Sequence, residues 1–120
     1  VVAEVVPFIE DMAAAYAHAD WVIARSGALT VAEVATVGLA ALFVPFPYAV
    51  DDHQTANAQA LVDAGAATVV QQADLTPQRL AEIIAAQHER GLLLKQADRA
   101  RSLSHAQALA KIIQEIETLL

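Results

Sequence analysis

The sequence predicts an α/β fold in which helices cover both faces of a parallel sheet. Short apolar runs alternate with helix-like segments along its 120 residues, and this alternation requires crossover connections between parallel strands. The runs are almost wholly apolar, as strands are when helices bury both of their faces. Glycine and small polar residues follow several of the runs, at the edge where an open parallel sheet binds ligands.

Four apolar runs are the expected strands, and they cover residues 1–8, 21–24, 41–44 and 67–70. The first run is rich in β-branched valine and ends at Pro7, because a proline cannot donate to a strand ladder. The third run is closed in the same way by Pro45. Four strands make a small sheet for this class of fold.

Helices are expected between and after these runs, over residues 11–20, 29–37, 53–64 and 77–88, with two more within 92–120 that separate at 102–104. Alanine and larger apolar residues recur at helical spacing in these segments. Gly38, Gly65 and Gly91 are expected C-terminal stops, and Thr76 followed by Pro77 is a favourable helix start.

The composition narrows the class of function. Hydrophobic residues make up 57% of the chain, which is ample for a core, but aromatic residues only 5%. The formal net charge of -7 argues against nucleic-acid binding and against electrostatic docking of this part on an anionic membrane. The chain has no cysteine, which excludes disulfides, thiolate metal sites and cysteine nucleophiles.

The turn after the second run is the first candidate ligand site. Ser26 and Gly27 are small, so a ligand can approach the backbone, and the helix that follows presents free N–H groups that favour phosphate. Thr30 points at the same space, and the carboxylate of Glu33, one turn into the helix, can accept hydrogen bonds from two ribose hydroxyls. A helix cap with ordinary first-turn electrostatics would use the same residues, so both interpretations stay open.

The loop after the third run is the second candidate. Gln54 and Asn57 share a helix face, and their amides can donate to hydroxyls or phosphate oxygens. Asp51, Asp52 and His53 suggest either a metal site or a polar loop before a helix. We favour the polar loop and expect no metal, because no further ligand recurs at a suitable spacing.

Taken in order, these segments resemble the MurG family of bacterial UDP-N-acetylglucosamine transferases. The resemblance rests on the strings FIEDMAAAY (8–16), RSGALTVAE (25–33), ALFVP (41–45) and HQTANA (53–58). It implies a GT-B architecture of two Rossmann-like domains, with residues 1–120 as the later part of the C-terminal donor domain, ending in C-terminal helices. The N-terminal acceptor domain is expected to be absent from this chain.

The resemblance implies an inverting transfer of N-acetylglucosamine from UDP-N-acetylglucosamine to lipid I, which forms lipid II in peptidoglycan synthesis. The enzyme is expected to be peripheral at the cytoplasmic face of the bacterial inner membrane, without cofactor or metal. Catalytic residues, the lipid I contacts and the membrane contacts are expected in the missing domain, so no catalytic residue is assigned here. We therefore expect the chain alone to be inactive.

Carried over by position, the family's donor contacts fall on the segments already described. The implied UDP-N-acetylglucosamine contacts are Ile9 at the uracil, Ala28, Leu29, Thr30, Val31 and Ala32 along the nucleotide, Glu33 at the ribose and Gln54 at the sugar. Secondary candidates are Arg25, Ser26, Gly27, His53 and Asn57. The alternatives are another GT-B enzyme of UDP-sugars, either a lipid-linked glycosyltransferase or a UDP-N-acetylglucosamine 2-epimerase, and a non-catalytic α/β nucleotide-binding module.

Overall fold

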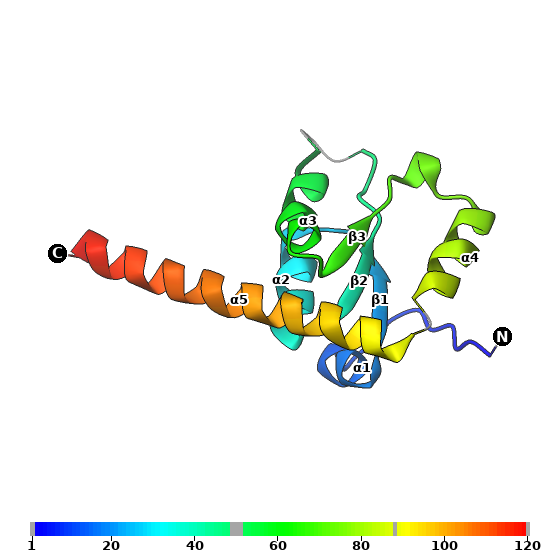
Figure 1. Cartoon of the computed structure of the whole chain (residues 1–120), viewed down its shortest axis with the longest axis horizontal. Coiled ribbons are helices and arrows are strands. Elements are labelled where there is room, and N and C mark those ends of the chain that lie inside the picture. The colour runs from blue at the N-terminus through cyan, green and yellow to red at the C-terminus, as the bar shows by residue number, and fades with distance from the viewer. Residues whose placement is uncertain (1, 49–51, 88, 120) are drawn as a thin grey trace.

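A parallel sheet lies at the centre of the molecule (Figure 1). The computed structural model describes residues 2–48, 52–87 and 89–119, and this part of the chain contains three strands in the order β1-β2-β3. They are β1 (Trp21–Ala24), β2 (Ala40–Phe43) and β3 (Ala67–Val69). Parallel neighbours need crossover connections, and helices supply them here as the sequence predicts.

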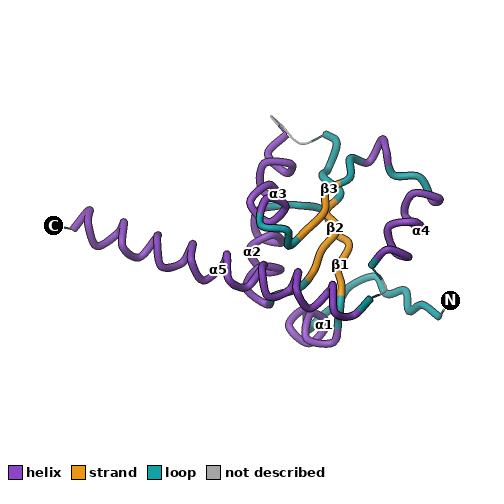
Figure 2. The backbone as a smooth tube through the Cα atoms, in the orientation of Figure 1, coloured by secondary structure: helices purple, strands orange, loops and turns teal. Residues whose placement is uncertain are grey.

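Helices make up much of the remaining described chain (Figure 2). They are α1 (Met12–His18), α2 (Ala28–Val37), α3 (His53–Asp63), α4 (Pro77–Ala86) and α5 (Arg90–Leu119), with the short 3-10 helix η2 (Gln72–Asp74) before α4. The predicted end signals are confirmed at two places. Thr76 caps α4 by accepting a hydrogen bond from the Arg79 N–H at 3.1 Å, and Gly38 ends α2 in the left-handed region at φ 80°.

The two faces of β2 pack against different helices, because successive strand side chains point in opposite directions. Phe43 joins a core cluster with Val34 of α2 and Leu61 of α3. Leu42 faces the other way, where Leu80 of α4 packs against its cluster. Figure 1 shows α4 across the sheet from α2 and α3. The predicted cover of helices on both faces is therefore confirmed.

The predicted first strand is wrong for the residues that can be described. Residues 2–10 are exposed and form no strand, and Val2 and Val5 are almost completely open to solvent. A β-branched run forms a strand only when a neighbour supplies a ladder and its side chains are covered. The sheet in the described chain consequently has three strands rather than four.

The predicted break near the C-terminus is also wrong. Helix α5 is one continuous helix of 30 residues, and it passes through Ser102 without interruption. A serine inside a helix costs only a few tenths of a kcal/mol relative to alanine, so the surrounding leucine and alanine residues carry the helix across it. Gly91 lies in the first turn of α5 rather than ending α4, which stops at Ala86. The predicted extension of that helix to His88 lies outside the described residues.

Arginines of α5 reach the C-terminal ends of two other helices. Arg101 donates to the Val37 carbonyl at 3.5 Å and Arg99 to the Gly65 carbonyl at 3.4 Å. Helix C-termini carry partial negative charge, so cations are favourable there. The far part of α5 extends beyond the rest of the molecule (Figure 1). In the described chain no helix combines the length and apolarity needed to cross a membrane.

Candidate functional site

The start of α2 carries main-chain N–H donors for which the described residues supply no acceptor. Gly27 is its N-cap and makes no side-chain cap hydrogen bond, and the helical ladder begins with the Val31 N–H donating to the Gly27 carbonyl at 3.0 Å. The N–H groups of Ala28, Leu29 and Thr30 precede that bond, where a helix has no internal acceptors. These donors and the helix dipole together favour an anionic ligand.

The β1–α2 turn is fastened to the first turn of α3. The Ser26 hydroxyl donates to the Gln54 carbonyl at 2.7 Å, and the Asn57 amide donates to the Ser26 carbonyl at 3.0 Å. Ser26 is completely buried, so its hydroxyl serves this link and does not face solvent. The two segments that the parallel sheet was expected to bring to one edge are therefore in direct contact.

The side chain of Gln54 is fixed next to the start of α2. Its Oε1 accepts a hydrogen bond from the Phe46 N–H at 2.8 Å, which holds the amide against the loop after β2. Its Nε2 lies 4.0 Å from the position that a Cβ on Gly27 would take. The amide donor is thus directed toward the same space as the free N–H groups of α2.

Glu33 has a partner that the sequence did not reveal. The hydroxyl of Tyr16, on α1, donates to Glu33 Oε2 at 2.9 Å. Burial raises the pKa of Tyr16 above its ordinary value, and the hydrogen bond to Glu33 and the negative charge of Glu33 raise it further. Both residues line a hollow of about 440 Å³ between α1 and α2 that Met12 and Leu29 also border.

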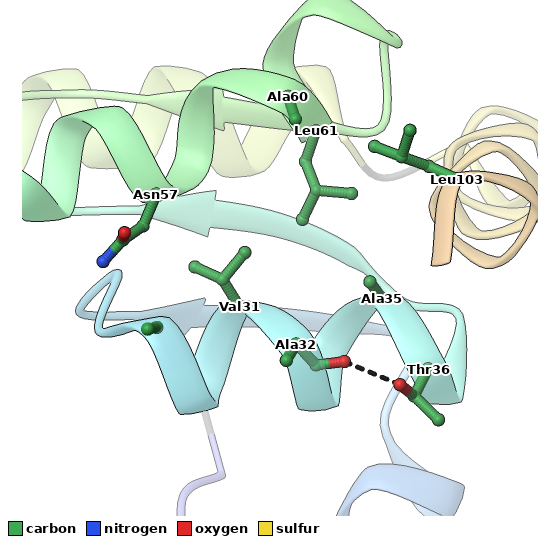
Figure 3. A pocket seen from close by; sticks show the side chains of 9 residues that line it. Val31, Ala32, Ala35, Thr36, Asn57, Ala60, Leu61 and Leu103 are labelled. Atoms are coloured by element: carbon green, nitrogen blue, oxygen red, sulfur yellow. Dashed lines mark hydrogen bonds between the residues drawn. The ribbon is translucent and has the colours of Figure 1, made fainter. Parts of the chain in front are cut away.

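The predicted nucleotide contacts on α2 divide between two sides of the helix, because consecutive helical residues differ by about 100° in direction. Leu29 and Glu33 border the hollow toward α1. Ala28 and Val31 line a separate pocket of about 210 Å³ between α2 and α3, and Ala32 borders both spaces. Figure 3 shows Val31 directed toward α3.

This second pocket has little chemistry to offer a polar ligand. The side chains that Figure 3 shows around it are mainly apolar, with the Asn57 amide near one end and Leu103 of α5 near the other. The Thr36 hydroxyl donates to the Ala32 carbonyl at 2.8 Å within its own helix. The pocket between α2 and α3 is therefore mainly an apolar space, and the polar part of the candidate site lies at the start of α2.

Three further predicted residues occupy different surroundings. Arg25 is turned to the sheet edge, where it donates to the carbonyls of Val44 and Pro45 at 3.3 and 3.2 Å and to Gln72 Oε1 at 2.7 Å. His53 is exposed at the first position of α3. Ile9 is exposed in the segment before α1. The arginine joins the ends of two strands, and the other two side chains are open to solvent.

Residue types alone gave only weak signals for the contacts that were missed. Tyr16 stands at a helical spacing of four from Met12, which predicts an inward face but not a partner on another helix. Phe46 lies in the loop after β2 and acts through its main chain, which any residue except proline could do. Among the described residues, no group of three or more His, Cys, Asp or Glu side chains could hold a metal ion.

Comparison with known proteins identifies the family to which the chain belongs. The pattern of the glycosyltransferase family 28 C-terminal domain matches residues 1–116. A relative from Dichelobacter nodosus is 61% identical over 98% of this chain and 32% of its own length. One from Burkholderia multivorans is 58% identical over 95% of this chain and 31% of its own length. Both are named UDP-N-acetylglucosamine--N-acetylmuramyl-(pentapeptide) pyrophosphoryl-undecaprenol N-acetylglucosamine transferase.

A solved structure gives the same result for the fold. The crystal structure of Acinetobacter baumannii MurG matches 93% of this chain with a TM-score of 0.80 and 50% sequence identity. The match covers 33% of that protein, so the chain spans about a third of the length of the relatives it matches. The resemblance to MurG inferred from the sequence is confirmed, and with it the α/β fold of a GT-B C-terminal domain.

Proposed function

We propose that this chain is the donor-binding part of an N-acetylglucosaminyltransferase, because it belongs to the glycosyltransferase family 28 C-terminal domain family. The observation that carries this proposal is the uncapped start of α2, with the Gln54 amide fixed beside it. A diphosphate bound there would accept hydrogen bonds from the free N–H groups of the helix. The donor would be UDP-N-acetylglucosamine, the sugar nucleotide that the names of the relatives contain.

The remaining donor contacts follow from the same placement. Glu33 would accept hydrogen bonds from the ribose hydroxyls, at the border of the hollow between α1 and α2. Gln54 would donate to the sugar from the other side of the helix start, with Asn57 fixing the turn between them. Ile9 would meet the uracil through its backbone, in the segment just before α1. His53 would lie beside Gln54 near the sugar, and Arg25 would hold the loop after β2 through its hydrogen bonds to the Val44 and Pro45 carbonyls.

The complete reaction requires more than this chain supplies. We propose that the full-length protein transfers N-acetylglucosamine with inversion to lipid I and so produces lipid II for peptidoglycan. Residues 1–120 would form part of the donor domain, and the acceptor site, the general base and the membrane contacts would lie in an N-terminal domain. An undecaprenol-linked acceptor would place the protein peripherally at the membrane, on the cytoplasmic face of the inner membrane.

A donor-competition assay on the full-length protein tests this function. Radiolabelled UDP-N-acetylglucosamine and a lipid I analogue should give labelled lipid II, and unlabelled UDP-N-acetylglucosamine should suppress the label far better than UDP-glucose or UDP-galactose. Equal competition by the three sugar nucleotides would reject the donor assignment. Absence of transfer to the lipid I analogue, with donor binding intact, would reject the acceptor assignment instead.

A further inference from the structure

We propose that Tyr16 is a positioning residue for Glu33, which holds the Glu33 carboxylate in the orientation that accepts the ribose hydroxyls of the donor. This inference rests on the proposed function. Its basis is the 2.9 Å hydrogen bond from the Tyr16 hydroxyl to Glu33 Oε2, between residues 17 apart in sequence and on two different helices.

Tyr16 is a rigid support for this contact. Tyr16 is only 9% exposed and belongs to the main core cluster, together with Val34 and Leu39. Its helix is also fixed at its start, where the Asp11 side chain accepts a hydrogen bond from the Ala14 N–H at 3.0 Å. A phenol packed in this way has few alternative rotamers, so the direction in which its hydroxyl points is set by the fold.

Glu33 by contrast has a long side chain that would otherwise sample many rotamers at a half-buried position. One of its oxygens is engaged by Tyr16, and among the described residues no donor binds the other, Oε1. Glu33 lines the hollow between α1 and α2, so a ligand with neighbouring hydroxyls has room to reach its carboxylate. Ordering the carboxylate before the ligand arrives lowers the entropic cost of binding.

The chemistry of the supporting group suits this role. A hydrogen bond from a neutral phenol orients the carboxylate and leaves its negative charge in place for the hydroxyl donors, whereas a lysine or arginine would neutralise it. Burial, followed by the hydrogen bond and charge of Glu33, raises the pKa of Tyr16. The phenol therefore keeps its proton, and remains a donor, throughout the neutral range.

Binding of UDP and of 2′,3′-dideoxy-UDP to the full-length protein, measured by calorimetry, tests the inference. The wild type should prefer UDP by about tenfold or more, the effect of hydrogen bonds to a charged group. Tyr16→Phe, which keeps the ring, should reduce this preference about fivefold by weakening UDP alone. In a Glu33→Ala background the same substitution should change nothing, because its effect passes through that carboxylate.

Tyr48→Phe is the matched control, since it deletes the same hydroxyl from a residue that is 81% exposed, and it should leave the preference unchanged. If Tyr16→Phe weakened UDP and 2′,3′-dideoxy-UDP equally, Tyr16 would only support the fold and the inference would be wrong, while the role of Glu33 stood. An undiminished preference in Tyr16→Phe would reject the inference in the same way. If the wild type bound both nucleotides alike, the ribose role of Glu33 would fail together with the inference.

Discussion

Replacing Gly27 by alanine should weaken donor binding and leave the free energy of unfolding unchanged. The backbone of Gly27 has φ −61° and ψ 151°, a conformation that any L-residue adopts without strain. An added Cβ would meet its nearest neighbour, Gln54 Nε2, at 4.0 Å, which is ordinary van der Waals contact. The new methyl group would therefore fit the protein, but it would occupy the space between the start of α2 and the Gln54 amide.

The two consequences of this substitution have different sizes. Removing glycine flexibility from the unfolded chain stabilises by about 0.4–1 kcal/mol, and alanine is a poorer N-cap than glycine by a similar amount. The net change in the free energy of unfolding should thus be about zero. A phosphate held off the helix start would lose at least one charge-assisted hydrogen bond, which contributes about 1.5–3 kcal/mol. The affinity should fall by about 10- to 150-fold.

Calorimetric titration of the full-length Gly27→Ala protein with UDP-N-acetylglucosamine, alongside urea unfolding, measures both quantities. Gly91→Ala is the control, because a Cβ there would meet no atom within 4 Å. It should strengthen the first turn of α5 slightly and leave donor affinity unchanged. If Gly27→Ala folded normally and bound the donor as tightly as the wild type, the phosphates would not approach α2 at Gly27 and the reasoning would be refuted.

Three further predictions concern other positions. Gln54→Ala should reduce the preference for UDP-N-acetylglucosamine over UDP in calorimetry while sparing UDP itself, and equal losses for both ligands would count against a sugar contact. Gly38→Ala should lower the free energy of unfolding by about 1–2 kcal/mol, because left-handed backbone is costly for alanine and its Cβ would lie 2.8 Å from Arg101 Nε; unchanged urea unfolding would contradict this. The raised pKa of Tyr16 means that the folded state holds this proton more tightly than the unfolded state. The contribution of protonated Tyr16 to the free energy of unfolding should therefore be complete below pH 10 and disappear as the pH rises through the folded-state pKa. In Tyr16→Phe, the free energy of unfolding should lack this pH-dependent contribution.

Much of the sheet could be predicted from the sequence because its signals are local. The strand 21–24 is observed with the predicted bounds, and Gly38 ends α2 as predicted, since an apolar run and a left-handed glycine need no knowledge of distant residues. The valine run before Pro7 misled the prediction. Its β propensity is genuine, but no neighbouring strand pairs with it and no helix covers it in the described chain.

The candidate site divides in the same way. The rule that parallel strands deliver their following loops to one edge correctly brought Ser26 and Gln54 together. The contact between Tyr16 and Glu33 could not be predicted, because it depends on how α1 rotates against α2. Nor could the direction of Arg25, since its guanidinium has several carbonyl acceptors within reach and only packing selects among them.

The hydrogen bond from the Phe46 N–H to Gln54 Oε1 fixes the orientation of the Gln54 amide. A main-chain N–H can only donate, so the glutamine must present its oxygen to the loop and its NH₂ group to the opposite side. The amide is thereby prevented from flipping, and on the side away from the loop it presents its NH₂ hydrogens to a ligand rather than its oxygen. At this position the protein can therefore recognise acceptor oxygens of a ligand. A glutamate has nearly the same shape as Gln54, but its negative charge would repel a negatively charged sugar nucleotide.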